Sequence, residues 1–177
     1  KRGVEKPRER VLSEEEIRTF WLGLDGGPLS VGVTRVLRLA LLTGQRRSEI
    51  AEAQKSEFNL QDATWTIPSR RTKNGVTHIV PLSSRAMSIV REAFADSLTE
   101  FVFPGRPAGI RDAINPHAVS RAMARLMDHL KVPDAPTVHD LRRTVGTELA
   151  RLGVNRDIRA RVLNHVTGAK SVTDSVY

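Results

Sequence analysis

Residues 137–152, with the sequence TVHDLRRTVGTELARL, combine a histidine and an arginine in a pattern that suits phosphate binding. His139 and Arg142 are three residues apart, which places both on one face if the segment is helical. They fall in the predicted first turn, where the positive end of the helix dipole and unpaired N–H groups favour an anion. A planar guanidinium adds bidentate hydrogen bonds to phosphate oxygens. A surface His and Arg on an ordinary amphipathic helix share this spacing, so the hypothesis depends on the other segments.

A second arginine follows a segment that is predicted to be a buried helix. The apolar run VGVTRVLRLALLT occupies residues 31–43, Gly44 interrupts it, and Arg46 precedes Glu49 by three residues. At that spacing the carboxylate can orient the guanidinium, and a charge placed against a buried helix is costly without a partner. The segment therefore predicts either a structural ion pair or an arginine that is held in place for an anionic ligand.

A β-hairpin is predicted at residues 64–82, where two β-rich runs flank the Asn-Gly pair at 74–75. This dipeptide is the strongest short-range hairpin signal. Lys73 lies just before the turn, on a mobile tip that could reach a neighbouring site, although a solvated turn lysine is the commoner situation. Arg70 and Arg71 add positive charge to the same hairpin.

The elements that must position these side chains are predicted from capping signals and apolar spacing. Helix starts are indicated by the capping boxes Ser13/Glu16 and Thr137/Asp140, by Ser83 or Ser84, by Asn115-Pro116 and by Asn155. Apolar residues at steps of three and four follow them, and after Thr137 these are Val138, Leu141, Val145, Leu149 and Leu152. Residues 101–111, rich in Gly and Pro, are predicted to be a loop. The pattern indicates a mainly helical α+β domain with a small antiparallel sheet that includes the hairpin.

Composition points to a soluble domain with an anionic partner. The 177 residues carry 28 Lys and Arg against 20 Asp and Glu, a formal net charge of +8, which favours nucleic acid, although a merely basic soluble protein has the same balance. No apolar run is long enough to span a membrane. Cysteine is absent, which excludes disulfides and thiolate zinc sites. Neither a phosphate-binding glycine loop nor a metal-ligand spacing occurs, so no cofactor and no metal are expected.

The ends of the chain suggest a part of a longer protein. Residues 1–12 begin without a methionine, are highly charged, and are predicted to be a linker or arm from an upstream DNA-binding region. Residues 13–177 are predicted to be the catalytic domain, truncated at or just after the only tyrosine, Tyr177.

Five pieces occur in this chain order: TGQRRSEI, RTKNGVTHIVPLS, HDLRRT, LNH and a distal tyrosine. Together they resemble the catalytic domain of tyrosine recombinases, the phage integrase family. The resemblance is closest to integrases of prophages and genomic islands, and it extends from about residue 13 to residue 177. It implies that two arginines clamp the scissile phosphate, that a lysine and two histidines assist proton transfer and charge stabilisation, that an acidic residue supports the first arginine, and that a tyrosine is the nucleophile. By similarity these are Arg46 and Arg142, Lys73, His139 and His165, Glu49, and Tyr177.

The resemblance further implies a site-specific recombinase that cleaves and rejoins DNA through a 3′-phosphotyrosyl intermediate without metal or ATP. The expected partner is double-stranded DNA at attachment sites, bound by a homotetramer of the whole protein in the cytoplasm, whereas the isolated chain is expected to be monomeric and not membrane-bound. Further arginines are candidate DNA contacts, although a solvated face explains any one of them: Arg47, Arg70, Arg71, Arg121, Arg125 and Arg143.

Three alternatives remain open at this stage. An inactive DNA-binding remnant of an integrase fits the same composition, and a type IB topoisomerase shares the chemistry, although the TGQRRSEI and LNHVTG segments argue against it. A helix-turn-helix regulator explains the charge but not Arg46, Lys73 and Tyr177. The absence of any segment after Tyr177 and of the usual N-terminal domains predicts weak DNA binding and poor recombination by this chain alone.

Overall fold

The computed structural model describes residues 9–105 and 112–165. The helices within these ranges are α1 (Glu14–Gly26), α2 (Val31–Thr43), α3 (Arg47–Ala51), α4 (Ser84–Asp96), α5 (Pro116–His129), α6 (Val138–Arg151) and α7 (Arg156–Val162). The strands are β1 (Phe58–Asn59), β2 (Thr64–Ile67) and β3 (His78–Pro81), and single 3-10 turns η1 (Lys55–Glu57) and η2 (Ser69–Arg71) adjoin them. The strands form one antiparallel sheet in the order β1-β2-β3. This mainly helical α+β architecture confirms the predicted fold class.

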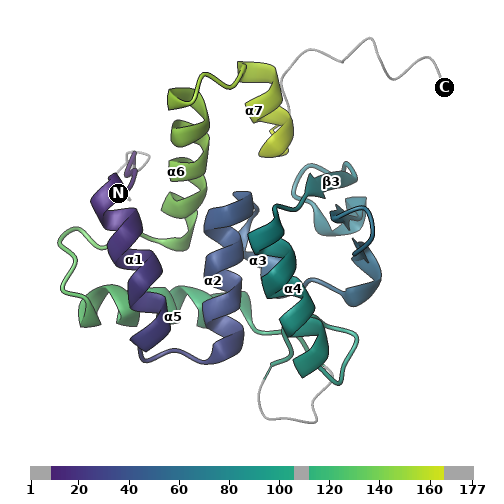
Figure 1. The fold of residues 1–177 in the computed structure, drawn as a ribbon, viewed down its shortest axis with the longest axis horizontal. Coiled ribbons are helices and arrows are strands. Elements are labelled where there is room, and N and C mark those ends of the chain that lie inside the picture. Colours follow the sequence, from purple (N-terminus) through teal and green to yellow (C-terminus); the bar gives the residue numbers. More distant parts are fainter. Residues whose placement is uncertain (1–8, 106–111, 166–177) are drawn as a thin grey trace, which may run out of the picture.

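Helix α2 is the centre of the fold. Its sequence is apolar on nearly all sides, so it can be covered from several directions, and it packs against α1, α3, α4, α5 and α6. Figure 1 shows α1, α2 and α4 side by side, with α5 passing across α1 and α2. Gly44 ends α2 in the left-handed conformation at φ +66°. The chain can therefore turn sharply towards Arg46.

Both predicted capping boxes are formed. The Ser13 hydroxyl accepts from the Glu16 backbone N–H and the Glu16 carboxylate accepts from the Ser13 N–H. Thr137 and Asp140 make the same exchange at the start of α6. The positions of His139 and Arg142 therefore follow from a local signal, because the cap determines where α6 begins.

The segment before α1 is packed on the domain. The Leu12 side chain is buried and its N–H donates to the Thr144 hydroxyl at 3.0 Å, while Arg10 forms ion pairs with Glu16 and Asp134. Bonding to Arg10 lowers the pKa of Glu16 to about 2. The fold thus includes the end of the segment that was predicted to be a linker; residues 1–8 lie outside the described residues.

The predicted hairpin is formed, but its connection is longer than a tight Asn-Gly turn. Thr64 pairs with Pro81 and Ile67 with His78, so the strands are joined by the ten residues 68–77, within which the Gly75 N–H donates to the Thr72 carbonyl at 3.4 Å. Pro68 has no N–H for the sheet. The 3-10 turn η2 follows it and directs the chain away from the strands.

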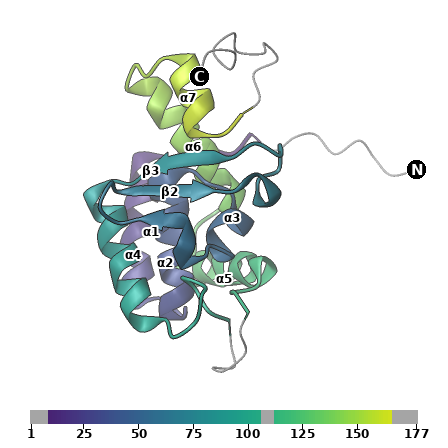
Figure 2. The same ribbon diagram turned by 90° about the vertical axis from the view of Figure 1, so that its right-hand side faces the viewer.

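The second half of α6 is more exposed than its apolar stripe predicts. Val138 and Leu141 are buried, Val145 and Leu149 are partly covered, and Leu152 is 78% exposed. In Figure 2 the end of α6 extends above the rest of the molecule with α7 beside it. The stripe predicts which face of α6 is apolar, but the rest of the domain covers only the first part of that face. No helix in the described ranges is long and apolar enough to cross a membrane.

Candidate active site

Arg142 lies buried between α2 and α7. The side chain is on the first turns of α6, the residue is 4% exposed, and Nη1 donates to the Gly44 carbonyl at 2.6 Å. Nη2 donates to the Leu163 carbonyl. Burial and then the nearby charge of Arg46 lower the pKa of Arg142 to about 10. The guanidinium therefore remains charged at neutral pH, held by two backbone carbonyls from separate segments.

Arg46 is held by the ion pair that its spacing from Glu49 predicts. Its Nη1 lies 3.0 Å from Glu49 Oε1, and Glu49 Oε2 accepts from the Arg46 backbone N–H at 2.9 Å. Glu49 is 1% exposed, so the carboxylate is a fixed partner and not a solvated one. Arg46 Nη2 lies 3.4 Å from the Asn164 carbonyl. Both the side chain and the backbone of Arg46 are thus oriented by one carboxylate.

The C-terminal turn of α7 brings the two arginines together. Three consecutive carbonyls there accept hydrogen bonds: Val162 from Gln45 Nε2 at 2.9 Å, Leu163 from Arg142, and Asn164 from Arg46. The last carbonyls of a helix have no intrahelical partner and form the negative end of its dipole, so cationic donors are favoured there. The turn thereby brings segments that are far apart in the sequence into one region.

Two histidines lie in the same region. Burial comes first in lowering the pKa of His139, followed by the charges of Arg143 and Arg142. The pKa of His165 is lowered by burial and then by Arg142, Arg46 and His139. His165 directly follows Asn164, whose carbonyl receives Arg46, and His139 is three residues before Arg142 on α6, so each histidine is close to one of the two arginines. The lowered pKa values favour neutral imidazoles at pH 7, which can accept or relay a proton.

Lys73 lies at the edge of this region, and Tyr177 lies outside the described residues. The Lys73 side chain is exposed on the loop 68–77. The next residue, Asn74, donates through Nδ2 to Asn164 Oδ1 at 2.7 Å. The loop that carries Lys73 is therefore attached to the same turn that receives the arginines.

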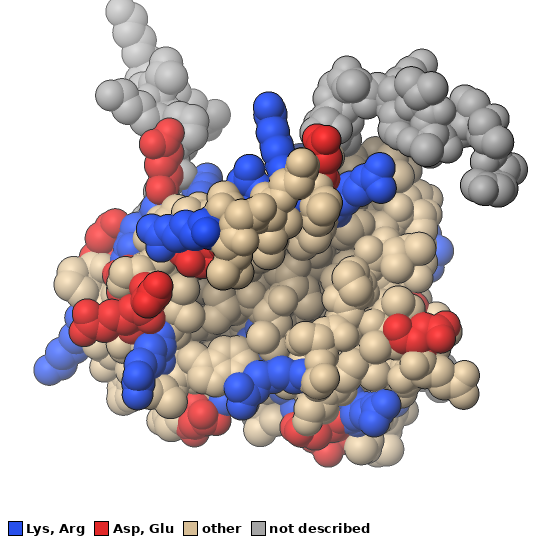
Figure 3. Space-filling model, turned by 45° about the horizontal axis from the view of Figure 1, so that its top comes forward, with Lys and Arg blue, Asp and Glu red and all other residues tan. Residues whose placement is uncertain are grey.

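Five of the six arginines that were considered as DNA contacts divide into two groups, and the sixth, Arg71, differs from both. Arg70, Arg121 and Arg125 are exposed. Arg47 donates to the Ser120 hydroxyl and Arg143 to Asp140 Oδ1. The exposed face in Figure 3 is hollowed, and Lys and Arg side chains stand around the hollow together with several acidic ones.

Arg71 has a structural environment that its sequence position does not reveal. It donates to the backbone carbonyls of Glu49 and Glu52, and it forms an ion pair with Glu57 at 3.1 Å. These contacts join the loop 68–77 to α3, so Arg71 is removed from the candidate DNA contacts.

Four further residues that contact the candidate active site were not predicted from the sequence: His78, Gln45, Asn74 and Asn164. His78 is 8% exposed on β3, and burial lowers its pKa while the Val162 carbonyl and Glu49 oppose that shift. The signal was available for His78, because the two-residue period of a strand places positions 78 and 80 on one buried face. No local pattern marks the others, since their partners are distant in the sequence.

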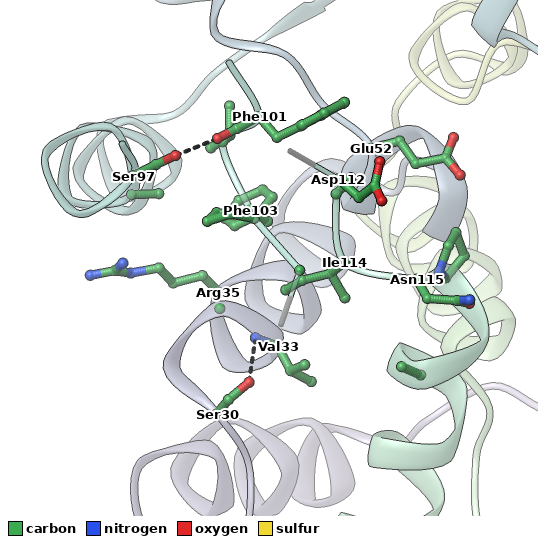
Figure 4. Close-up of a pocket in the computed structure, with 18 of the residues that line it drawn as sticks. Ser30, Val33, Arg35, Glu52, Ser97, Phe101, Phe103, Asp112, Ile114 and Asn115 are labelled. Atoms are coloured by element: carbon green, nitrogen blue, oxygen red, sulfur yellow. Dashed lines mark hydrogen bonds between the residues drawn. The ribbon is translucent and has the colours of Figure 1, made fainter. Parts of the chain in front are cut away.

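A separate cavity of about 1010 Å³ lies at the opposite end of α2, near the end of α4. Figure 4 shows Val33, Phe103 and Ile114 at its wall. It contains none of the predicted catalytic residues that the structure describes. In residues 9–105 and 112–165 as a whole, no group of three or more His, Asp and Glu side chains could hold a metal ion.

Comparison with known proteins gives a consistent result. A model described as the phage integrase family matches residues 10–174. The chain is 30% identical over 139 residues to prophage integrase IntZ and 32% identical over 169 residues to prophage integrase IntA, both of Escherichia coli (strain K12). These alignments cover 78% and 93% of the chain but only 33% and 40% of the two relatives.

Solved structures share the fold. An integrase from mycobacterium phage Brujita has a TM-score of 0.70 at 25% identity, covering 98% of this chain and 56% of that one. A lambda integrase tetramer bound to a Holliday junction has a TM-score of 0.73 at 18% identity, covering 97% and 51%. XerA recombinase gives 0.71 at 18% identity, covering 93% and 58%.

Proposed function

The chain belongs to the phage integrase family, and we propose that it forms the catalytic domain of a site-specific recombinase that breaks and rejoins DNA. The observation that carries the proposal is the meeting of Arg46 and Arg142 on the consecutive carbonyls of Leu163 and Asn164 after α7. His165 is the next residue in the chain, and His139 precedes Arg142 by three residues on α6. Two guanidinium groups in this arrangement suit the non-bridging oxygens of a phosphodiester.

The chemistry requires one nucleophile and one leaving-group proton. The phenolic oxygen of Tyr177 attacks the phosphorus, the bond from phosphorus to the 5′ oxygen breaks, and the DNA is left joined to the protein through a 3′-phosphotyrosyl bond. Lys73 supplies the proton to the departing 5′ oxygen, and His139 takes part in removing the proton of the tyrosine. The covalent bond conserves the energy of the phosphodiester, so a 5′ hydroxyl can reverse the step without ATP.

Most of the catalytic work in such a transfer is positioning and charge stabilisation. Arg46 and Arg142 supply both, because each is fixed by protein contacts before the substrate binds. The Glu49 carboxylate orients Arg46, and the Gly44 and Leu163 carbonyls orient Arg142. His165 adds a further donor or acceptor next to the turn.

The expected partner is double-stranded DNA, and the net charge of +8 supports that expectation. Arg47, Arg70, Arg121, Arg125 and Arg143 are the proposed phosphate contacts. Since the chain spans only a third to two fifths of its two relatives, recognition of the attachment site and assembly as a homotetramer on DNA are proposed for the full-length protein. A tetrameric, DNA-bound relative supports this proposal.

The proposal is tested by trapping the covalent intermediate. We expect the full-length protein to form a denaturant-stable adduct with candidate attachment-site duplexes, which are taken from the junctions of the encoding element with its host DNA. Tyr177→Phe should abolish the adduct and retain DNA binding in a gel-shift assay, because only the nucleophilic oxygen is lost. EDTA should leave adduct formation by the unsubstituted protein unchanged.

An adduct that persists in Tyr177→Phe would assign the nucleophile to another residue. DNA binding by the unsubstituted protein without any adduct would support the inactive remnant. Relaxation of supercoiled plasmid without exchange of DNA partners would instead support topoisomerase-like activity.

A further inference from the structure

Two asparagines from distant segments form a reciprocal amide pair beside the candidate active site. Asn74 Nδ2 donates to Asn164 Oδ1 at 2.7 Å, and Asn164 Nδ2 donates back to Asn74 Oδ1 at 3.3 Å. Asn74 Nδ2 also lies 3.4 Å from the Asn164 carbonyl, which receives Arg46. Both residues are partly buried. The pair directly links the loop 68–77 to the turn after α7.

The backbone at Asn164 indicates that its side chain matters. Its φ is +47°, in the left-handed region, which asparagine tolerates better than most residues but which glycine adopts without strain. Glycine would satisfy the turn equally well and would make no amide contact. The position therefore combines a turn conformation with a side chain that reaches Asn74.

The loop backbone is held on both sides of Lys73. Before it, the buried Thr72 hydroxyl lies 3.0 Å from the Ser69 carbonyl and 2.9 Å from the Val76 carbonyl. After it, the Asn74 amide binds Asn164 and also accepts from the Val76 N–H at 3.3 Å. The Lys73 side chain remains exposed. Together with the contacts of Arg71 to α3, the contact of Asn74 with Asn164 attaches this loop to the turn that receives the arginines.

We propose that Asn74 and Asn164 are positioning residues for Lys73. Their amide pair holds Lys73 against the turn after α7, which carries His165 and binds Arg46 and Arg142. The inference rests on the proposed function, because it concerns the delivery of the leaving-group proton. When the bond from phosphorus to the 5′ oxygen breaks, a proton passes from Lys73 Nζ to that oxygen. The amide pair takes no part in this transfer, but it determines where Nζ stands.

The test compares substitutions on two substrates, using the full-length protein and a candidate attachment-site duplex. One duplex has the natural 5′-bridging oxygen and the other has sulfur at that position. A thiolate leaves without protonation, because thiols have a pKa of roughly 8.5. A variant that fails only in delivering the proton therefore recovers on the sulfur duplex.

Asn164→Gly is the principal variant, because glycine keeps the left-handed turn and removes only the amide. We expect it to cleave ordinary DNA about 10- to 100-fold more slowly, since small displacements of a catalytic group cost up to that much. Most of this loss should be recovered on the sulfur duplex, as for Lys73→Ala. Asn74→Asp, which keeps the acceptor for Val76 and removes the donors to Asn164, should behave in the same way.

Asn59→Gly is the matched control. The Asn59 amide makes comparable contacts with Gln61 and Asp62 in the exposed turn after β1, so its loss should leave both rates unchanged. The double variant with Asn74→Asp and Asn164→Gly should cleave ordinary DNA no more slowly than the slower of the two single variants, because both substitutions break the same contact.

The inference is overturned if Asn164→Gly stays as slow on the sulfur duplex as on ordinary DNA while Lys73→Ala recovers. The pair would then stabilise the arginine site and not the lysine. It is also overturned if Lys73→Ala itself fails to recover, although adduct formation by the unsubstituted protein would still support the proposed function. The absence of an adduct from the unsubstituted protein on both duplexes would reject the proposed function itself.

Discussion

The contacts of Arg46 show how a partly exposed arginine is oriented before any substrate arrives. Its guanidinium and its backbone N–H both bind the buried carboxylate of Glu49. A long side chain normally loses conformational entropy when it binds a ligand. Here the ion pair has already restricted Arg46, so more of the interaction with a phosphate is available to stabilise the developing charge.

We predict that Arg46→Ala in the full-length protein slows cleavage much more than it weakens DNA binding. Cleavage should slow about 10²- to 10³-fold, the usual cost of removing one fixed donor from a developing charge. DNA affinity should fall much less, because many other Lys and Arg residues share the phosphate contacts. Single-turnover cleavage rates and gel-shift titrations at one salt concentration measure the two effects.

The control for Arg46→Ala is Glu49→Gln, which keeps an acceptor for the Arg46 N–H but removes the carboxylate charge. It should slow cleavage less than Arg46→Ala, and the double variant should be no slower than Arg46→Ala alone. Equal losses of cleavage and binding would contradict this interpretation, since they indicate that Arg46 stabilises the bound substrate as much as the transition state.

Among the secondary-structure elements, the junction between the end of α2 and the end of α7 is the critical contact. Gly44 contributes its carbonyl to Arg142, and a β-carbon at this position would lie 2.8 Å from Leu163 Cδ2 and 3.0 Å from Val145 Cγ1. The absence of a side chain at Gly44 thus allows α6 and α7 to approach α2 closely.

Gly44→Ala should therefore be strongly destabilising. The left-handed backbone costs an alanine about 1–2 kcal/mol, and overpacking against Leu163 and Val145 adds about 1–3 kcal/mol. The free energy of unfolding, measured by urea denaturation, should fall by roughly the sum of these two amounts. Adduct formation should also fall, since the displaced Leu163 carbonyl holds Arg142.

Gly153→Ala separates the two contributions. Gly153 also has a left-handed backbone, at φ +75°, but in the described part of the chain no atom beyond its immediate neighbours lies within 4 Å of a β-carbon placed there. Its substitution should cost only the backbone strain of about 1–2 kcal/mol. Equal destabilisation by the two variants would show that the close packing around Gly44 contributes nothing.

The molecule as a whole should lose stability as the pH falls below about 6.5. The pKa values of His78, His139 and His165 are all below the usual 6.5 in the folded protein, with burial the first cause. The unfolded chain therefore binds more protons just below pH 6.5, and the free energy of unfolding rises with pH through that window and levels off above it. Glu16, with a pKa of about 2 against 4.5, loses its stabilising effect only below about pH 4.5.

His78 provides the check, because it is the most deeply buried of the three histidines. His78→Gln should reduce the difference in the free energy of unfolding between pH 5 and pH 7.5, whatever its effect on stability at pH 7.5. The measurement is urea denaturation at both pH values. An unchanged difference would mean that the other histidines or the carboxylates carry the pH dependence.

Several features of this protein were determined by the sequence itself, because they depend on residues within a few positions of each other. The capping boxes at Ser13 and Thr137, the end of α2 at Gly44 and the ion pair between Arg46 and Glu49 are of this kind. Such contacts form within one or two helical turns, so spacing alone predicts them. The order of the motifs also predicted the family and the fold class.

Tertiary structure decided the features that depend on distant partners. Only packing of α7 against the end of α2 brings Arg46, Arg142 and Gln45 onto consecutive carbonyls. The Asn-Gly pair at 74–75 is a strong local turn signal, yet the strands separate earlier, because Arg71 binds α3 and Asn74 binds Asn164. An unpaired carbonyl at a helix end, or an arginine that satisfies it, has no periodic sequence pattern, because its partner is chosen by three-dimensional proximity and not by spacing along the chain.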